Sequence, residues 1–128
     1  MNLLISARSS MSIVTAVVLL VGASAATGQQ STEQYIPIGS SPGVSGKYSY
    51  IGQLAAVDLA NRRLTVEDAS GEHSIAMNQG TRIWLDRTAS RRANTVGSYA
   101  DCQVGRRVEV MPMHDDPGVA AWIKIEAR

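Results

Sequence analysis

The chain has 128 residues, with twelve Lys and Arg against eleven Asp and Glu, and it contains no Phe. A nearly neutral chain lacks the basic excess on which bulk nucleic-acid binding depends, so we expect no natural nucleic-acid partner. The length allows a single domain, whose core must consist mainly of Val, Ile, Leu and Ala.

Residues 1–26 follow the pattern of a secretory signal peptide. Arg8 is the positive charge, residues 11–22 are an apolar run, and residues 23–26 are small, as a cleavage site requires. The apolar run is shorter than the roughly 20 residues that span a bilayer, so we expect no membrane span after cleavage. The mature protein is therefore expected to be periplasmic or secreted.

Residues 27–46 are rich in Gln, Ser, Gly and Pro and show no periodic apolar pattern. This composition is typical of a flexible leader. A small apolar island at residues 35–38 either docks on the domain or a partner, or has no role. The folded domain is then expected to cover residues 47–128.

Short runs of β-forming residues, separated by turn residues, fill the rest of the chain. The runs cover residues 48–57, 63–67, 72–77, 81–85, 106–113 and 119–127. Residues 86–105 form a longer polar connection, in which residues 98–103 favour one helical turn. No long amphipathic helix interrupts the series, so the pattern predicts a small antiparallel all-β barrel or sandwich.

The last two runs form a hairpin around the turn signal at residues 115–118. Pairing the strands outward from this turn sets Glu109 opposite Lys124 on one face. The same register sets Val110 opposite Ile123 on the other face. A slip of one residue would break both patterns, so the register is well specified. The charged face is predicted to point to solvent.

On that outward face the register places Met111 opposite Trp122, with Met113 beside them. Exposed apolar patches often mark surfaces that bind partners. We therefore expect Met111, Met113 and Trp122 to bind a protein of the cell envelope. Alternatively, the leader or the connection at residues 86–105 folds over the patch.

The order of turns and strands along the chain carries a resemblance. Its elements are residues 52–58, 63–68, Gly71, 81–85, 101–105, 108–110 and 121–125. This order resembles small exported bacterial β-barrel domains of unknown function with an oligonucleotide/oligosaccharide-binding (OB-like) architecture. The resemblance implies an antiparallel OB-like barrel of five to six strands, and it implies no catalytic residues.

A second resemblance is to the periplasmic copper chaperones of metal efflux systems, which hold Cu(I) with His and Met beside a Trp. The residues that carry it are His73, Met77, Met111, Met113, His114 and Trp122. It implies a Cu(I) site at His73, Met111, Met113 and His114, since thioether and imidazole donors suit this ion. The chain lacks the Trp-x-x-Met-x-Met arrangement of those chaperones. The other interpretation is a protein without any cofactor, in which His73 and Met77 continue the core face of Ile75.

A local basic cluster offers a further candidate site. It consists of Arg82, Arg87, Arg91 and Arg92, and Trp84 would add a stacking platform beside it. These residues suit an anionic glycan, a lipid headgroup or another anion. The alternative is a solvated loop.

Enzyme activity is not expected. The chain has no Gly-x-Ser-x-Gly elbow and no His-Glu-x-x-His pair, and several of its Asp residues lie in turns that they cap. The single cysteine, Cys102, has no partner for an internal disulfide and is expected to be a small buried side chain. The sequence thus indicates an exported, non-catalytic binding module. The alternatives are a soft-metal protein and an anion- or glycan-binding module.

Overall fold

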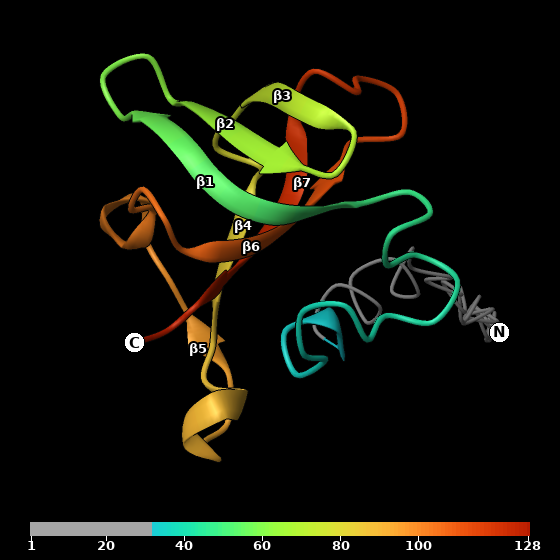
Figure 1. Ribbon diagram of the computed structural model, residues 1–128, viewed down its shortest axis with the longest axis vertical. Helices are drawn as coiled ribbons and strands as arrows, with labels where there is room; N and C mark the ends of the chain where they lie inside the picture. The colour runs from blue at the N-terminus through green and yellow to red at the C-terminus, as the bar shows by residue number, and fades with distance from the viewer. Residues whose placement is uncertain (1–31) are drawn as a thin grey trace, which may run out of the picture.

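Seven strands lie side by side in one mixed sheet of order β3-β2-β1-β6-β7-β4-β5 (Figure 1). This computed structural model describes residues 32–128, so the predicted signal peptide at residues 1–26 lies outside the described residues. The strands are β1 (Tyr50–Asp58), β2 (Arg63–Asp68), β3 (Gly71–Ala76), β4 (Arg82–Asp86), β5 (Thr95–Val96), β6 (Arg107–Pro112) and β7 (Ala120–Glu126). Two short 3-10 helices, η1 (Thr88–Ser90) and η2 (Tyr99–Asp101), lie in the long connection. The described residues contain no helix long and apolar enough to cross a membrane.

The all-β class is confirmed, and the six predicted runs match β1 to β4, β6 and β7. The predicted helical turn at residues 98–103 corresponds to η2. The expectation of five to six antiparallel strands is wrong in two respects, because β5 is a seventh strand and β4 runs parallel to β7. The sheet is strongly curled, but it is not closed into a barrel. Local alternation predicts that a strand exists and which face is apolar, whereas the choice of distant neighbours depends on tertiary packing.

The apolar core lies within the curl of the sheet. Its buried members are Leu54, Leu64, Val66, Ile75, Met77, Ile83, Cys102, Val108, Val110, Ala120, Ile123 and Ile125. They come mostly from alternate positions of the strands, as one buried face of a sheet requires. An isolated bridge between Ala76 and Val119 brings the end of β3 beside the start of β7 and fixes the curl.

Cys102 is buried in this core, as the sequence predicts. Burial, with a smaller contribution from the negative charge of Asp101, raises the pKa of its thiol to about 11. The thiolate, which is the nucleophilic form, is therefore strongly disfavoured at neutral pH.

The β6–β7 hairpin has the predicted register from Val108–Ile125 through Met111–Trp122. Beyond Met111 the predicted register does not continue: it would set Met113 opposite Ala120, but a bulge places Pro112 there instead. Proline has no N–H to donate to the ladder, and bulges are one of the few places where a sheet tolerates it. The N–H of Met113 donates to the carbonyl of Val119 instead.

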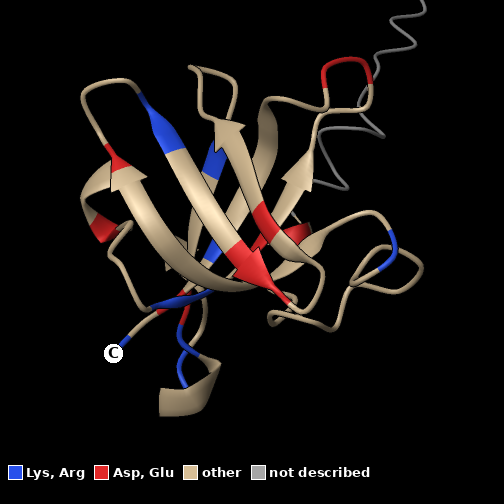
Figure 2. Ribbon diagram, turned by 45° about the horizontal axis from the view of Figure 1, so that its top comes forward, with Lys and Arg blue, Asp and Glu red and all other residues tan. Residues whose placement is uncertain are grey.

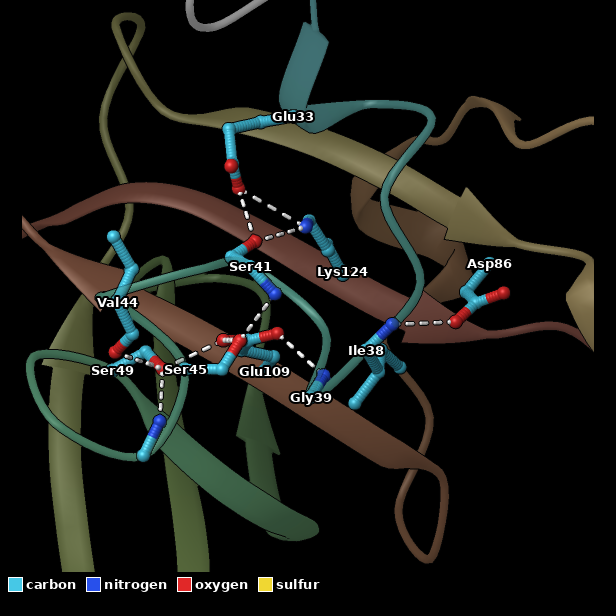
Figure 3. A network of polar contacts seen from close by, with 11 residues as sticks. Glu33, Ile38, Gly39, Ser41, Val44, Ser45, Ser49, Asp86, Glu109 and Lys124 are labelled. Carbon is cyan, nitrogen blue, oxygen red and sulfur yellow. Dashed lines mark hydrogen bonds and ion pairs between the residues drawn. The ribbon is translucent and has the colours of Figure 1, made fainter.

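Residues 32–49, which we call the strap, pack against the outer face of β6, β7 and β4 (Figure 3). The sequence indicates a flexible leader over most of this stretch, and the structure differs. Gly39, Gly43 and Gly46 have positive φ, and turn hydrogen bonds such as that from the Ser40 N–H to the Pro37 carbonyl fold the segment. The apolar island docks through Ile38, which is buried. Gly, Ser and Pro serve here to build successive tight turns.

Candidate functional site

The outer face of β6 and β7 carries two charged side chains that are completely inaccessible to solvent. Glu109 and Lys124 are cross-strand partners, and each has an exposed fraction of 0%. The sequence predicts their pairing correctly but places them on a solvent face, which is wrong. The strap covers this face, and nothing in the alternation of β6 and β7 distinguishes a solvated outer face from one covered by another segment of the chain.

The Glu109 carboxylate accepts three hydrogen bonds from the strap (Figure 3). The Gly39 N–H donates to Oε1 over 2.9 Å, and the hydroxyls of Ser45 and Ser49 donate to Oε2 over 2.7 and 2.6 Å. Hydrogen bonds to a charged acceptor are the stronger kind, and three of them compensate a buried carboxylate for lost hydration. A single buried side chain thus holds both ends of the turn between residues 39 and 49.

The Lys124 ammonium is also bound by residues of the strap, in this case Glu33 and Ser41. It lies 3.1 Å from the Glu33 carboxylate and donates to the Ser41 hydroxyl over 3.1 Å. The Ser41 hydroxyl in turn donates to Glu33 over 2.7 Å, which closes a small network. The ammonium also lies 4.6 Å from the centroid of the Trp122 ring, a cation–π geometry.

Asp86 fastens the strap at a third point. Its Oδ2 accepts a hydrogen bond from the Ile38 N–H over 2.8 Å, and its Oδ1 accepts one from the Thr88 N–H over 2.9 Å. Burial by itself would raise the pKa of this carboxyl. Hydrogen bonds from Thr88 and Ile38 and the charge of Lys124 outweigh it, so the pKa of Asp86 lies below its ordinary value. The group is therefore ionised at neutral pH.

The two tryptophans belong to this covered region. Trp84 and Trp122 are each 5% exposed, and their ring centroids lie 6.0 Å apart. Trp122 therefore does not form the exposed patch that the sequence predicts. Trp84 is not available as an open stacking platform for the basic cluster.

Met111 and Met113, by contrast, are only partly buried and line an open groove of about 450 Å³. The other lining residues are Gly46, Lys47, Tyr48, Ser49, Tyr50, Asp68, Ser70, Pro112, His114 and Pro117. One wall is thus the end of the strap and the start of β1, and the opposite wall is the end of β6 with its turn. The structure brings Met111, Met113 and His114 together on this groove, which we call the tyrosine–methionine groove.

His73, the fourth proposed metal ligand, is not among the residues that line the groove. Its ring stacks on Tyr50, with the centroids 4.0 Å apart, and its Nε2 lies 3.0 Å from the Asp68 carboxylate and 2.9 Å from the Ser70 hydroxyl. A hydrolytic triad needs the carboxylate and the serine on opposite ring nitrogens. Here both contact the same nitrogen, so these three side chains form a structural cap on the β2–β3 turn. Hydrogen bonds from Ser70 first, and then from His73, lower the pKa of Asp68.

Arg87, Arg91 and Arg92 flank η1, where Figure 2 shows basic ribbon segments beside the short helix, whereas Arg82 lies at the other end of β4, opposite Trp122. Arg82, Arg91 and Arg92 are exposed and Arg87 is partly buried. Because Trp84 is buried, the structure does not combine these arginines with an aromatic ring. Over residues 32–128 there is also no group of three or more His, Cys, Asp or Glu arranged to hold a metal ion.

Sequence reasoning missed the residues that cover the outer face, namely Glu33, Gly39, Ser41, Ser45 and Ser49. The one available signal is the spacing of the three serines, which recur every fourth residue. Comparison with protein-family models, with curated proteins and with solved structures yields no match for this chain.

Proposed function

We propose that the protein is an exported, non-catalytic binding module of the cell envelope that holds a short segment of a partner protein in the tyrosine–methionine groove. The observation that carries this proposal is the convergence of Tyr48, Tyr50, Met111 and Met113 on one open groove. Its volume of about 450 Å³ lies within the range of ordinary ligand sites.

The lining favours an extended peptide as the occupant. Aromatic-lined grooves bind extended and proline-containing segments, because such segments lose little conformational entropy on binding. Methionine side chains adapt to differently shaped apolar groups. Lys47 and Asp68 place opposite charges on the lining, which suits a segment carrying at least one charge of each sign.

The remaining parts of the proposal rest on other observations. Export rests on the signal-like pattern of residues 1–26, and the absence of catalysis rests on the single-nitrogen arrangement at His73. The OB-like architecture also stays a proposal, supported by the curl of the sheet and by the bridge that brings β3 beside β7.

Selection of displayed peptides on the purified chain tests the groove. Peptides enriched on the wild-type chain are expected to lose at least tenfold in affinity for Tyr48→Ala, because its side chain is exposed and lines the groove. Val96→Ser is the matched control, since Val96 is exposed on the distant edge strand β5. If no peptide is enriched, or if both variants bind the enriched peptides equally, the groove is not a segment-binding site.

A second candidate function is Cu(I) binding in the same groove. Met111, Met113 and His114 all line it, and their sulfur and imidazole donors suit this ion. Competition between the chain and a chromogenic Cu(I) chelator measures this binding directly. Changing Met111 and Met113 together to Leu is expected to abolish Cu(I) binding while peptide binding remains, since Leu keeps the apolar bulk. Met77→Leu in the buried core is the control and should leave Cu(I) binding unchanged.

A further inference from the structure

The strap and the sheet face beneath it are joined chiefly through charged side chains of the sheet. In the described part of the chain, every hydrogen bond accepted by the Glu109 carboxylate comes from the strap. Both hydrogen bonds donated by the Lys124 ammonium run to the strap as well. Although the two residues are cross-strand partners, they form no ion pair with each other.

Covering this sheet face does not by itself require two buried charges. Well-packed apolar residues of similar volume would cover it at no electrostatic cost, whereas buried charges are retained where they select one particular partner. The charges select for a specific pattern on the strap. It consists of a carboxylate at Glu33, an apolar anchor at Ile38, and hydroxyls at Ser41, Ser45 and Ser49.

The strap can also leave the sheet face without exposing either surface to a large electrostatic penalty. If the strap leaves, Glu109 and Lys124 become hydrated on an open sheet face, and the serines of the strap become hydrated in solution. Neither surface is then left with a buried unsatisfied charge, which is the state that makes a broken ion pair costly.

We propose that this face of β6, β7 and β4 is a receptor for acidic, serine-rich segments, and that the strap occupies it as an intramolecular ligand. The natural competitor is a segment of a partner protein that repeats the spacing of the strap. It carries three hydroxyls four residues apart, like Ser41, Ser45 and Ser49, and a carboxylate eight residues before the first of them, like Glu33. Because the strap is covalently attached, its effective concentration is high, and the competitor binds only when the strap is weakened. Residues 46–49 of the strap also line one wall of the tyrosine–methionine groove. The two proposals are still distinguishable, because binding of the strap peptide tests this face and loss of selected peptides on Tyr48→Ala tests the groove.

A labelled synthetic peptide of residues 32–49 tests the proposal by fluorescence anisotropy against the full chain. The peptide is expected to bind a chain carrying Ser41→Ala and Ser45→Ala at least tenfold more tightly than it binds the wild type. Ser40→Ala is the matched control, since Ser40 is an exposed serine of the same strap, and it should bind the peptide like the wild type. A peptide carrying Glu33→Gln should bind the weakened chain less tightly than the wild-type peptide does.

The receptor side is tested by adding Lys124→Met to the weakened chain, which should remove peptide binding. If the weakened chain keeps its strand signal in circular dichroism and binds no peptide, the proposal is wrong. Equal affinity for the weakened and wild-type chains would also overturn it, since the peptide would then not compete with the strap. If the double substitution prevents folding, Glu33→Gln alone is the milder change to the strap. The affinity of the peptide for that variant is then compared with its affinity for the wild-type chain.

Discussion

Glu109 and Lys124 lie directly opposite each other across β6 and β7, and each is bonded to the strap instead of to the other. The pair of opposite charges resembles a solvent-exposed cross-strand ion pair in sequence. In the structure it is an attachment point for strap residues that precede Glu109 and Lys124 by at least sixty positions in the chain. The consequence is that changes at these two positions test the strap, not the hairpin.

Glu109→Ala is expected to destabilise the domain by about 2–3 kcal/mol, because hydrogen bonds to a buried charged group contribute about 1.5–3 kcal/mol each and undocking of the strap limits the total loss. An exposed ion pair would be worth only about 0.2–1 kcal/mol. Urea unfolding measures the difference. Glu72→Ala, at an exposed position of β3, is the control and should be nearly silent. A loss no larger than that of the control would mean that the strap does not protect Glu109.

Val110→Asp should prevent folding, since Val110 is fully buried in the core and pairs with Ile123. Burying an unpaired carboxylate costs several kcal/mol, which is a large part of the stability of a domain this size. Circular dichroism and one-dimensional NMR report the outcome. Val104→Asp places the same charge at an exposed position and should fold normally. A folded Val110→Asp chain would contradict the buried register of β6.

These two substitutions mark how far the sequence predicts this fold. Alternation and turn residues predict six of the strands and the hairpin register, because both depend on neighbours close in the chain. The parallel pairing of β4 with β7 is not predictable in this way, since it joins segments separated by the long connection. The strap was missed for a different reason. Its Gly, Ser and Pro residues fit a flexible leader and a series of tight turns equally well, and only the partners on the sheet decide between them.

The candidate site was predicted only in part, because local patterns do not show which distant segments cover or line a face. Strand alternation places Met111 on the outer face, and in the structure Met111 and Met113 both line the tyrosine–methionine groove. The alternation pattern does not reveal that Trp122 on the same face is buried. The contributions of Tyr48 and Tyr50 to the groove depend on where the strap ends, so no local pattern indicates them.

Part of the loss of folding stability at low pH is expected to come from protonation of Asp86. Its pKa in the folded protein lies below the ordinary value of 3.8, so its contribution is fully present above the unfolded pKa. That contribution is lost as the pH falls through the folded pKa. Asp86→Asn should therefore show a shallower loss of stability than the wild type below about pH 4. Urea midpoints measured from pH 6 to pH 2 test this, and parallel curves for the two chains would contradict it.

Cys102 should resist alkylation in the native protein. Burial excludes the reagent, and a thiol pKa of about 11 leaves little thiolate at pH 8. Iodoacetamide labelling followed by mass spectrometry is expected to be slow in buffer and rapid in urea. A chain with Cys102→Ala and Ser90→Cys carries one exposed thiol instead and serves as the fast control. Rapid labelling of native Cys102 would indicate that the η2 region opens readily.

Two deletions compare the predicted leader with the observed strap. Removing residues 27–46 eliminates Ile38 and most partners of Glu109 and Lys124, whereas removing residues 27–31 leaves every described contact in place. The longer deletion is expected to lower stability by at least about 3 kcal/mol, since full burial of an Ile side chain alone contributes roughly 1.5–3 kcal/mol. Tryptophan emission should also shift to the red as Trp122 becomes hydrated beside Lys124. If the two deletions unfold at the same urea concentration with the same emission maximum, the strap is a flexible leader, as its composition suggests, and the receptor proposed beneath it has no resident ligand.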